Sequence, residues 1–249
     1  MKRFLIALQF LTILPVRITS EIAKEDFGKS LRYFPLVGML LGLALSGAAL
    51  LSYVLPIPVV TVLIVILSLL LTGGLHLDGF ADTCDGFYGR RSREKILEIM
   101  RDSRVGVMGV AGVFCLLSLK GVLIASLPQN GLGKVLILMT LFARWSQVLV
   151  CCTSPYARAE GKARYFVEYA GVKELLAGGF FTVAVFLLLM RLWGLVLFVL
   201  SLLPVVLFLG YVRHKLGGVT GDVIGAASEI AEVTVLLFGL LSLGVWYGM

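Results

Sequence analysis

The chain has 249 residues, of which 59% are hydrophobic and only 15% are charged. A soluble domain carries about 25% charged residues, so this composition leaves too little polar surface to cover a water-soluble fold. Together with a mean hydropathy of +1.00, it excludes an ordinary soluble enzyme, a disordered protein and a fibre. The net charge of +7 is typical of basic loops in a membrane protein, and we expect no nucleic-acid partner.

Seven apolar runs approach the length that a helix needs to cross a bilayer. They predict an all-α fold, a polytopic bundle of about seven transmembrane helices that forms one integral membrane domain over residues 1–249. The shorter apolar segment 4–16 precedes them, and we expect it to lie in the interface or to re-enter the membrane partway. The predicted spans are 33–55, 59–77, 105–127, 134–154, 176–191, 193–212 and 228–249.

The polar loops between these runs alternate between long and very short. The long loops 17–32, 78–104, 155–175 and 213–227 hold 16 of the 22 Lys and Arg residues and 13 of the 15 acidic residues. Under the positive-inside rule these four loops face the cytoplasm. The sequence therefore predicts a protein of the cytoplasmic (inner) membrane, with its active site on the cytoplasmic face and its C-terminus outside.

Two local patterns predict packing and capping. Gly38, Gly42 and Ser46 are four residues apart in the first long span, which favours close helix packing over a substrate groove. Residues 92–101 are typical of a short helix that begins after an N-cap at Ser92.

The segment 73–89 carries three aspartates on one helical stripe. Asp78, Asp82 and Asp85 are spaced i, i+4 and i+7, which places them within about 60° of one another on a helix. Three such carboxylates repel one another unless cations neutralise them, and oxygen ligands suit Mg²⁺ or Mn²⁺. The alternative is a solvated helix face just outside the bilayer. The neighbouring His76 is either a ligand or an interfacial histidine.

The exit of loop 78–104 combines basic and acidic residues. Arg101 and Arg104, with Ser103 between them, could clamp phosphate oxygens while Asp102 joins the metal shell. The alternative is that both arginines only anchor the span that follows.

A glycine-rich turn precedes the last predicted span. Such a turn at a helix N-terminus offers backbone N–H groups to an anion, although it can also do no more than turn the chain. No Gly-Lys-Ser/Thr follows, so it is not a Walker A loop. Carboxylates of Asp222 and Glu229 follow on the same side of the membrane. The residues assigned to this cradle are Gly217, Gly218, Thr220 and Gly221.

Charged residues also occur inside the predicted spans. Arg144 lies near the middle of 134–154, where an unpaired charge is costly, so we expect a carboxylate partner or the substrate beside it. We therefore count Arg144 among the candidate substrate-binding residues. Lys120 is nearer an edge and is predicted to reach the interface. Glu232 lies one turn deeper than Glu229 and could be a buried hydrogen-bonding residue.

Acidic ligands, phosphate clamps and a glycine cradle on one membrane face favour metal-assisted phosphoryl transfer. Two other functions remain open. A CDP-alcohol-type phospholipid phosphotransferase is one, although residues 82–90 match only the opening of its motif and Gly89 replaces the alanine of that motif. A cation-coupled transporter is the other, and it would need charges at the membrane midplane.

Four runs resemble the cobalamin synthase family, also called the adenosylcobinamide-GDP ribazoletransferases. They are RYFPLVG at 32–38, GGLHLDGFADT at 73–83, EIMRDSR at 98–104 and GGVTGD at 217–222. The runs extend over nearly the whole chain in the order of the family.

The resemblance implies an enzyme embedded in membrane lipid that depends on Mg²⁺, with Mn²⁺ as a possible substitute. It would join α-ribazole, or its 5′-phosphate, to adenosylcobinamide-GDP and release GMP. The product would be adenosylcobalamin or its phosphate, in the last step of nucleotide-loop assembly. A homo-oligomer is compatible with the sequence.

The resemblance also implies roles for the candidate residues. Asp82, Asp85 or His76 would act as the general base. The metal ligands would be Asp78, Asp82 and Asp85. Asp102 and Asp222 would be further ligands or would surround the residues that bind the metal.

Overall fold

The computed structural model describes the backbone of residues 1–247 and the side chains of residues 1–243. Within this part of the chain the regular elements are helices, with two short 3₁₀ turns and no β-strand. The helices are α1 (Lys2–Leu11), α2 (Lys24–Ser30), α3 (Phe34–Ala49), α4 (Ile57–Thr72), α5 (Leu75–Phe87), α6 (Arg93–Ile99), α7 (Val107–Ser126), α8 (Gln129–Thr153), α9 (Arg164–Glu168), α10 (Val172–Met190), α11 (Leu192–Leu216) and α12 (Gly221–Tyr247).

Six helical segments are long and apolar enough to cross a membrane, and a seventh is obtained if α4 and α5 count as one broken span. Each predicted span overlaps one long helix, and the end of the span 228–249 lies outside the described residues. The predicted all-α membrane bundle is therefore confirmed.

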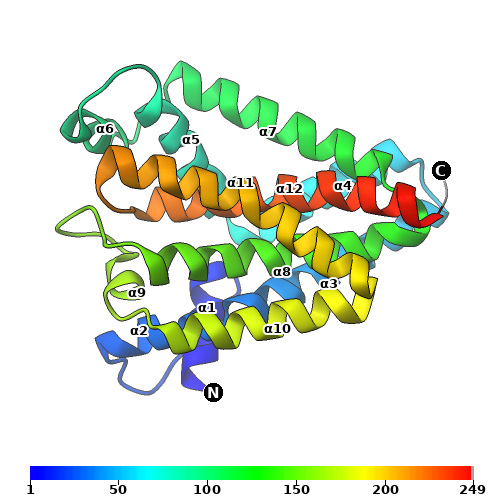
Figure 1. Cartoon of the computed structure of the whole chain (residues 1–249), viewed down its shortest axis with the longest axis horizontal. Coiled ribbons are helices and arrows are strands. Elements are labelled where there is room, and N and C mark those ends of the chain that lie inside the picture. The colour runs from blue at the N-terminus through cyan, green and yellow to red at the C-terminus, as the bar shows by residue number, and fades with distance from the viewer. Residues whose placement is uncertain (248–249) are drawn as a thin grey trace.

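The long connections lie together at one end of the bundle, which we call the loop end. It holds α2, α6, α9 and the turn between α11 and α12, whereas the short connections and the C-terminal end of α12 lie at the opposite end (Figure 1). The four loops that the sequence predicts on one side of the membrane thus lie on one side of the molecule.

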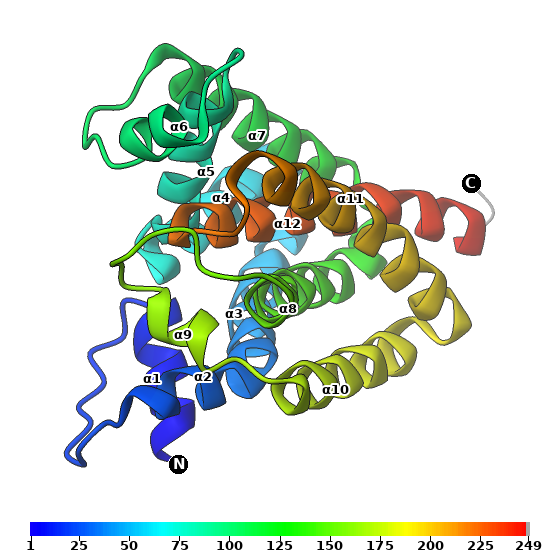
Figure 2. The same ribbon diagram turned by 60° about the vertical axis from the view of Figure 1, so that its left-hand side comes forward.

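Helix α1 runs across the bundle instead of along it (Figures 1 and 2). Its 10 residues extend about 15 Å, too short to span a bilayer, as predicted. Ile6, Ala7 and Leu11 are buried against the rest of the protein. Lys2 and Arg3 pair with Asp26 of α2 at 2.6 and 3.0 Å, which ties α1 to the loop end.

Helix α8 forms the centre of the bundle, between α3, α10 and α12 (Figure 2). A Cβ atom on Gly42 of α3 would approach Cα of Ile137 to 2.6 Å, so only glycine allows the two helices to lie this close. The Thr140 hydroxyl donates to the Gly38 carbonyl at 2.7 Å. The small residues of α3 therefore serve helix packing, as predicted.

The predicted span 59–77 is wrong at its C-terminal end. Gly73 and Gly74 both adopt left-handed backbone angles, with φ of 62° and 69°, which end α4 at Thr72. The chain then turns by 92° into α5. The predicted short helix is confirmed as α6, where the Ser92 hydroxyl accepts from the Lys95 amide at 3.3 Å.

Candidate functional site

Helix α5 packs against α12 and α7 near the loop end, and glycines make this close approach possible. A Cβ atom on Gly79 would lie 2.8 Å from the Asp222 backbone, and one on Gly225 would lie 3.1 Å from the His76 carbonyl oxygen. The backbones of α5 and α12 therefore nearly touch. This contact brings Asp222, which is far away in the sequence, beside the aspartate stripe of α5.

Asp82 is the centre of the acidic group. The charges of Asp222, Asp78 and Asp85 all act on it. Within the described side chains, neither Asp78 nor Asp82 has a hydrogen-bond or ion-pair partner. Asp222 has one cation, since its carboxylate lies 2.8 Å from Nη2 of Arg158.

Asp85 has a different role, although it belongs to the same stripe. Its two carboxylate oxygens accept hydrogen bonds from the amides of Gly106 at 2.7 Å and Gly109 at 2.8 Å. These amides belong to the first turn of α7, where a helix has unpaired donors and favours a negative charge. Asp85 therefore caps α7, a role that the sequence analysis did not predict, and we leave it out of the metal set below.

The described part of the chain contains no group of three or more His, Cys, Asp or Glu side chains arranged to hold a metal ion. Mg²⁺, however, usually takes one or two carboxylates and completes its shell with water and substrate phosphates. One or two of the carboxylates of Asp78, Asp82 and Asp222 fit such a partial site because they supply only hard oxygen ligands. Among the described side chains Arg158 is the one cation paired with these three carboxylates, so their mutual repulsion is a further reason to expect a cation there.

A cavity of about 270 Å³ lies beside this acidic group. Charged side chains line one part of it: Asp78 and Lys162 are exposed, and Asp222 and Arg158 are partly buried. The other part is formed by buried residues, among them His76, Gln147, Cys151, Phe34 and Phe166. The cavity thus has a charged mouth and a largely apolar inner end.

The segment 155–163 supplies the basic side of the mouth, and the sequence analysis missed it. Tyr156 pairs with Val219 in an isolated parallel bridge, in which the Ala157 amide donates to the Val219 carbonyl at 2.8 Å. This pairing places Arg158 against Asp222, and Nη2 of Arg158 also donates to the Met100 carbonyl at 3.2 Å. Burial raises the pKa of the Tyr156 hydroxyl. The positive charge of the loop 155–175 is the one feature of the sequence that could have indicated that this segment lines the cavity mouth.

The predicted phosphate clamp is more open than expected. Arg101, Asp102, Ser103 and Arg104 are all exposed. Nη2 of Arg104 lies 2.7 Å from the Asp102 carboxylate, and this hydrogen bond lowers the pKa of Asp102 to about 2. Asp102 is also not among the carboxylates whose charges act on Asp82, and we leave it out of the metal set.

The predicted glycine cradle is largely used by the protein itself. Gly217 has a φ of 68° and ends α11, and the Val219 amide donates to the Pro155 carbonyl at 2.9 Å. The Thr220 hydroxyl is buried and accepts from the Val223 amide at 3.3 Å, so it caps α12. Of the four predicted cradle residues, which also include Gly218, only Gly221 lines the cavity.

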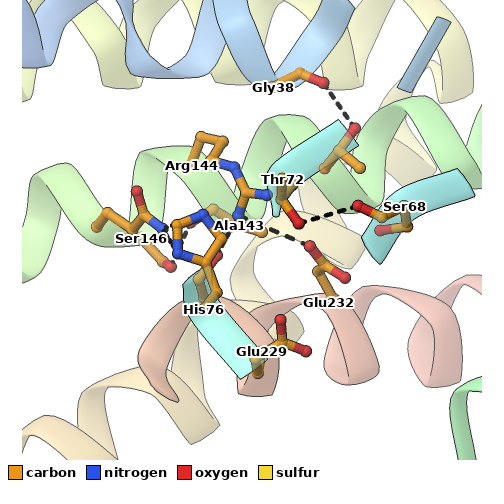
Figure 3. Close-up of polar contacts among 12 residues, drawn as sticks. Gly38, Ser68, Thr72, His76, Ala143, Arg144, Ser146, Glu229 and Glu232 are labelled. Carbon is orange, nitrogen blue, oxygen red and sulfur yellow. Dashed lines mark hydrogen bonds and ion pairs between the residues drawn. The ribbon is translucent and has the colours of Figure 1, made fainter. Parts of the chain in front are cut away.

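Arg144 and Glu229 form part of a buried ion cluster, which we define as Lys120, Arg144, Glu229 and Glu232. The Lys120 ammonium group pairs with Glu229 and lies 2.6 Å from Glu232. Arg144, only 1% exposed, donates to Ser228 and lies 3.7 Å from Glu232. Figure 3 shows Arg144 and Glu232 pointing toward each other from α8 and α12.

This cluster corrects the predictions for Lys120 and Glu229 and decides between the two alternatives for Arg144. Lys120 does not reach the interface but is buried among carboxylates. Arg144 has the intramolecular carboxylate partner that was one of its two predicted alternatives. Glu229 is paired inside the bundle, so neither Glu229 nor Arg144 is placed to bind a phosphate at the cavity mouth.

Comparison with known proteins connects this site with one family. Residues 3–241 match the family model described as cobalamin-5-phosphate synthase. The chain is 38% identical to the adenosylcobinamide-GDP ribazoletransferase of Acetivibrio thermocellus, over 95% of this chain and 96% of that protein. It is 40% identical to the protein of the same name from Geotalea daltonii, over 95% and 96% of the two chains.

The protein of that name from Clostridium acetobutylicum is 36% identical, over 95% of this chain and 94% of its own. No solved structure matches the chain. Because both the family model and these relatives extend over nearly the whole sequence, the chain belongs to the cobalamin-5-phosphate synthase family.

Proposed function

We propose that this protein is an adenosylcobinamide-GDP ribazoletransferase that uses Mg²⁺ at the cytoplasmic face of the membrane. The names of its relatives support the reaction. The observation that carries the proposal is the meeting of Asp78 of α5 and Asp222 of α12 at the mouth of a cavity, where the charges of both act on the neighbouring Asp82. Phosphoryl transfer needs positioning and charge neutralisation more than covalent chemistry, and this mouth has groups for both.

In the proposed reaction, a ribose hydroxyl oxygen that is free in both α-ribazole and its 5′-phosphate forms a bond to the phosphorus next to cobinamide. The bond from that phosphorus to the bridging oxygen breaks, and GMP leaves with the electron pair. The hydroxyl proton goes to a general base. Atoms and charges balance without a redox partner.

One or two of the carboxylates of Asp78, Asp82 and Asp222 would hold Mg²⁺ together with the diphosphate of the substrate. The bound ion would neutralise charge on the diphosphate and on the leaving GMP. Arg158 and Lys162 line the same mouth and would bind phosphate oxygens. Asp222 fixes the Arg158 guanidinium through their ion pair, so this cation is already oriented toward the site.

Asp82 is the best placed of the three predicted bases. Asp85 uses both oxygens to cap α7, and His76 is buried at the inner end of the cavity. Asp82 has no hydrogen-bond or ion-pair partner among the described side chains, so its oxygens are available. We therefore assign proton acceptance to Asp82.

The test is turnover by the purified full chain in lipid vesicles that are open to both sides. Incubation with adenosylcobinamide-GDP and α-ribazole is expected to release GMP in the presence of Mg²⁺. Chelation of the metal should abolish release, Mn²⁺ should restore part of it, and Zn²⁺ should not, because the ligands are all oxygen. A parent protein that releases no GMP under these conditions would refute the proposal.

The two rival functions predict other results in the same vesicles. A phospholipid phosphotransferase would consume a CDP-alcohol, and a transporter would accumulate a solute in sealed vesicles without GMP release. The ions of the buried cluster pair with one another, and the relatives carry ribazoletransferase names. Neither observation favours a rival.

A further inference from the structure

The inner end of the cavity contains polar atoms that the proposed chemistry does not use. Gln147 of α8 is fully buried, lines the cavity, and its Oε1 has no partner among the described residues. Its Nε2 lies 3.3 Å from both ring nitrogens of His76. One amide nitrogen cannot serve both ring nitrogens fully, so His76 also keeps hydrogen-bonding capacity. Buried polar atoms are rarely left without partners, which points to a ligand here.

Aromatic side chains surround these polar atoms. Phe10, Phe34 and Phe166 line the cavity, with ring centroids 4.4 Å apart for Phe10 and Phe166 and 5.5 Å apart for Phe34 and Phe166. Flat, apolar rings pack well against such faces. The charged lining residues, by contrast, are at least partly exposed at the mouth. The inner end therefore fits an uncharged aromatic group.

We infer that this cavity binds the acceptor riboside, with its aromatic base among the three phenylalanines and its ribose at the acidic mouth. A base with a fused hydrocarbon ring and one free nitrogen would accept a hydrogen bond from a ring N–H of His76. Oε1 of Gln147 would accept one from a ribose hydroxyl. The inference rests on the proposed function and gives His76 a binding role in place of a catalytic one.

The other nucleoside in the reaction fits this cavity less well. Guanine carries several donors and acceptors on its edges, and burying them without partners is costly. Gln147 and His76 offer too few groups to satisfy them. The corrinoid is excluded by size, because the cavity holds only about 270 Å³. A riboside with a mostly apolar base leaves fewer polar atoms unpaired.

The test is equilibrium binding of α-ribazole alone, and of GDP alone, to the purified full chain in detergent, measured by calorimetry. Gln147→Leu removes the polar atoms of that side chain with little change in volume. Phe166→Leu removes one of the aromatic rings that line the cavity. Each is expected to weaken α-ribazole binding at least tenfold and to leave GDP binding unchanged. The matched control is Phe114→Leu, because Phe114 lies on α7 with 71% of its surface exposed.

A kinetic readout separates binding from folding. In Gln147→Leu and Phe166→Leu, the KM for α-ribazole should rise while the KM for adenosylcobinamide-GDP stays within twofold of the parent. If one variant fails to fold, the other still tests the inference, because Gln147 lies on α8 and Phe166 lies on α9.

Two results would overturn the inference. In one, both variants bind α-ribazole as the parent does. In the other, GDP binding is lost and α-ribazole binding is kept, so that the cavity holds the nucleotide. Both are distinguishable from failure of the proposed function, in which the parent itself releases no GMP.

Discussion

Asp82 and Asp85 lie three residues apart on α5, but different groups surround them. Asp82 faces Asp78 and Asp222 and has no hydrogen-bond partner among the described side chains. Asp85 accepts two amide hydrogen bonds from the start of α7. The same substitution at the two positions should therefore have different consequences.

Asp82→Asn preserves size but removes one proposed metal ligand and base. We expect GMP release to fall by about 100-fold or more and the Mg²⁺ requirement to increase. Thermal stability should stay the same or increase slightly, because one repelling charge is lost. Parental turnover with unchanged Mg²⁺ dependence would show that Asp82 belongs to a solvated surface instead.

Asp85→Asn tests the capping role. The neutral amide keeps one acceptor oxygen but loses the charge that favours a helix N-terminus, so the expected loss of stability is about 1 kcal/mol. Thermal unfolding measures this loss, and the Mg²⁺ dependence of the remaining activity should match the parent. A raised Mg²⁺ requirement would restore Asp85 to the metal set.

At the cavity mouth, the planar guanidinium group of Arg158 binds two partners, the Asp222 carboxylate and the Met100 carbonyl. Arg158→Lys keeps the charge but cannot bind Asp222 and the Met100 carbonyl in the same geometry. Turnover should fall about tenfold to 100-fold, in line with the loss of one or two charge-assisted hydrogen bonds. The control is Arg104→Lys, because the Arg104 side chain is 88% exposed. Equal losses in both variants would return Arg104 to the site.

At the level of helices, the contact between α5 and α12 positions the acidic group. Gly79→Ala places a Cβ atom 2.8 Å from Cα of Asp222, so one helix must shift. We expect a loss of stability of about 1–3 kcal/mol together with a clear loss of GMP release. Gly47→Ala is the matched control, because a Cβ atom on Gly47 meets no atom within 4 Å. A fully active Gly79→Ala variant would contradict this tight packing.

The buried ion cluster joins α7, α8 and α12 through Lys120, Arg144, Glu229 and Glu232. Lys120→Met leaves two buried carboxylates with one cation, which should cost about 3–5 kcal/mol of stability. Adding Glu229→Gln restores the charge balance with Arg144 and Glu232. The double variant should therefore unfold at a higher temperature than Lys120→Met alone. Equal stability of the two would mean that the cluster does not act through charge pairing.

For the whole molecule, the shared position of the long loops predicts one orientation in the membrane. In a variant whose native cysteines are replaced by serine, Glu98→Cys and Glu160→Cys should react with an impermeant thiol reagent only from the cytoplasmic side. Asn130→Cys, at the opposite end, should react only from outside. All three positions are exposed. Labelling of Glu98→Cys from outside would reverse the proposed topology.

Hydropathy and charge are local properties, and they were sufficient to predict much of this protein. The seven apolar runs, the grouping of basic loops at one end and the helical stripe of aspartates all follow from neighbouring residues in the chain. The motifs at 73–83 and 217–222 also identified the family, which the comparisons confirm. None of these properties depends on which helices come into contact.

The partners of the charged residues were decided only by the tertiary structure. Periodicity shows which residues share a helix face but not which helix lies opposite. Asp85 therefore resembled Asp82 in sequence, although it caps α7 through the amide of Gly106, 21 residues later. Lys120 and Glu229 are 109 residues apart, and the pairing of residues 156 and 219 brings Arg158 to Asp222. Local sequence thus determined where charge lies along the bundle, whereas packing decided which charges neutralise one another and which remain available for a substrate.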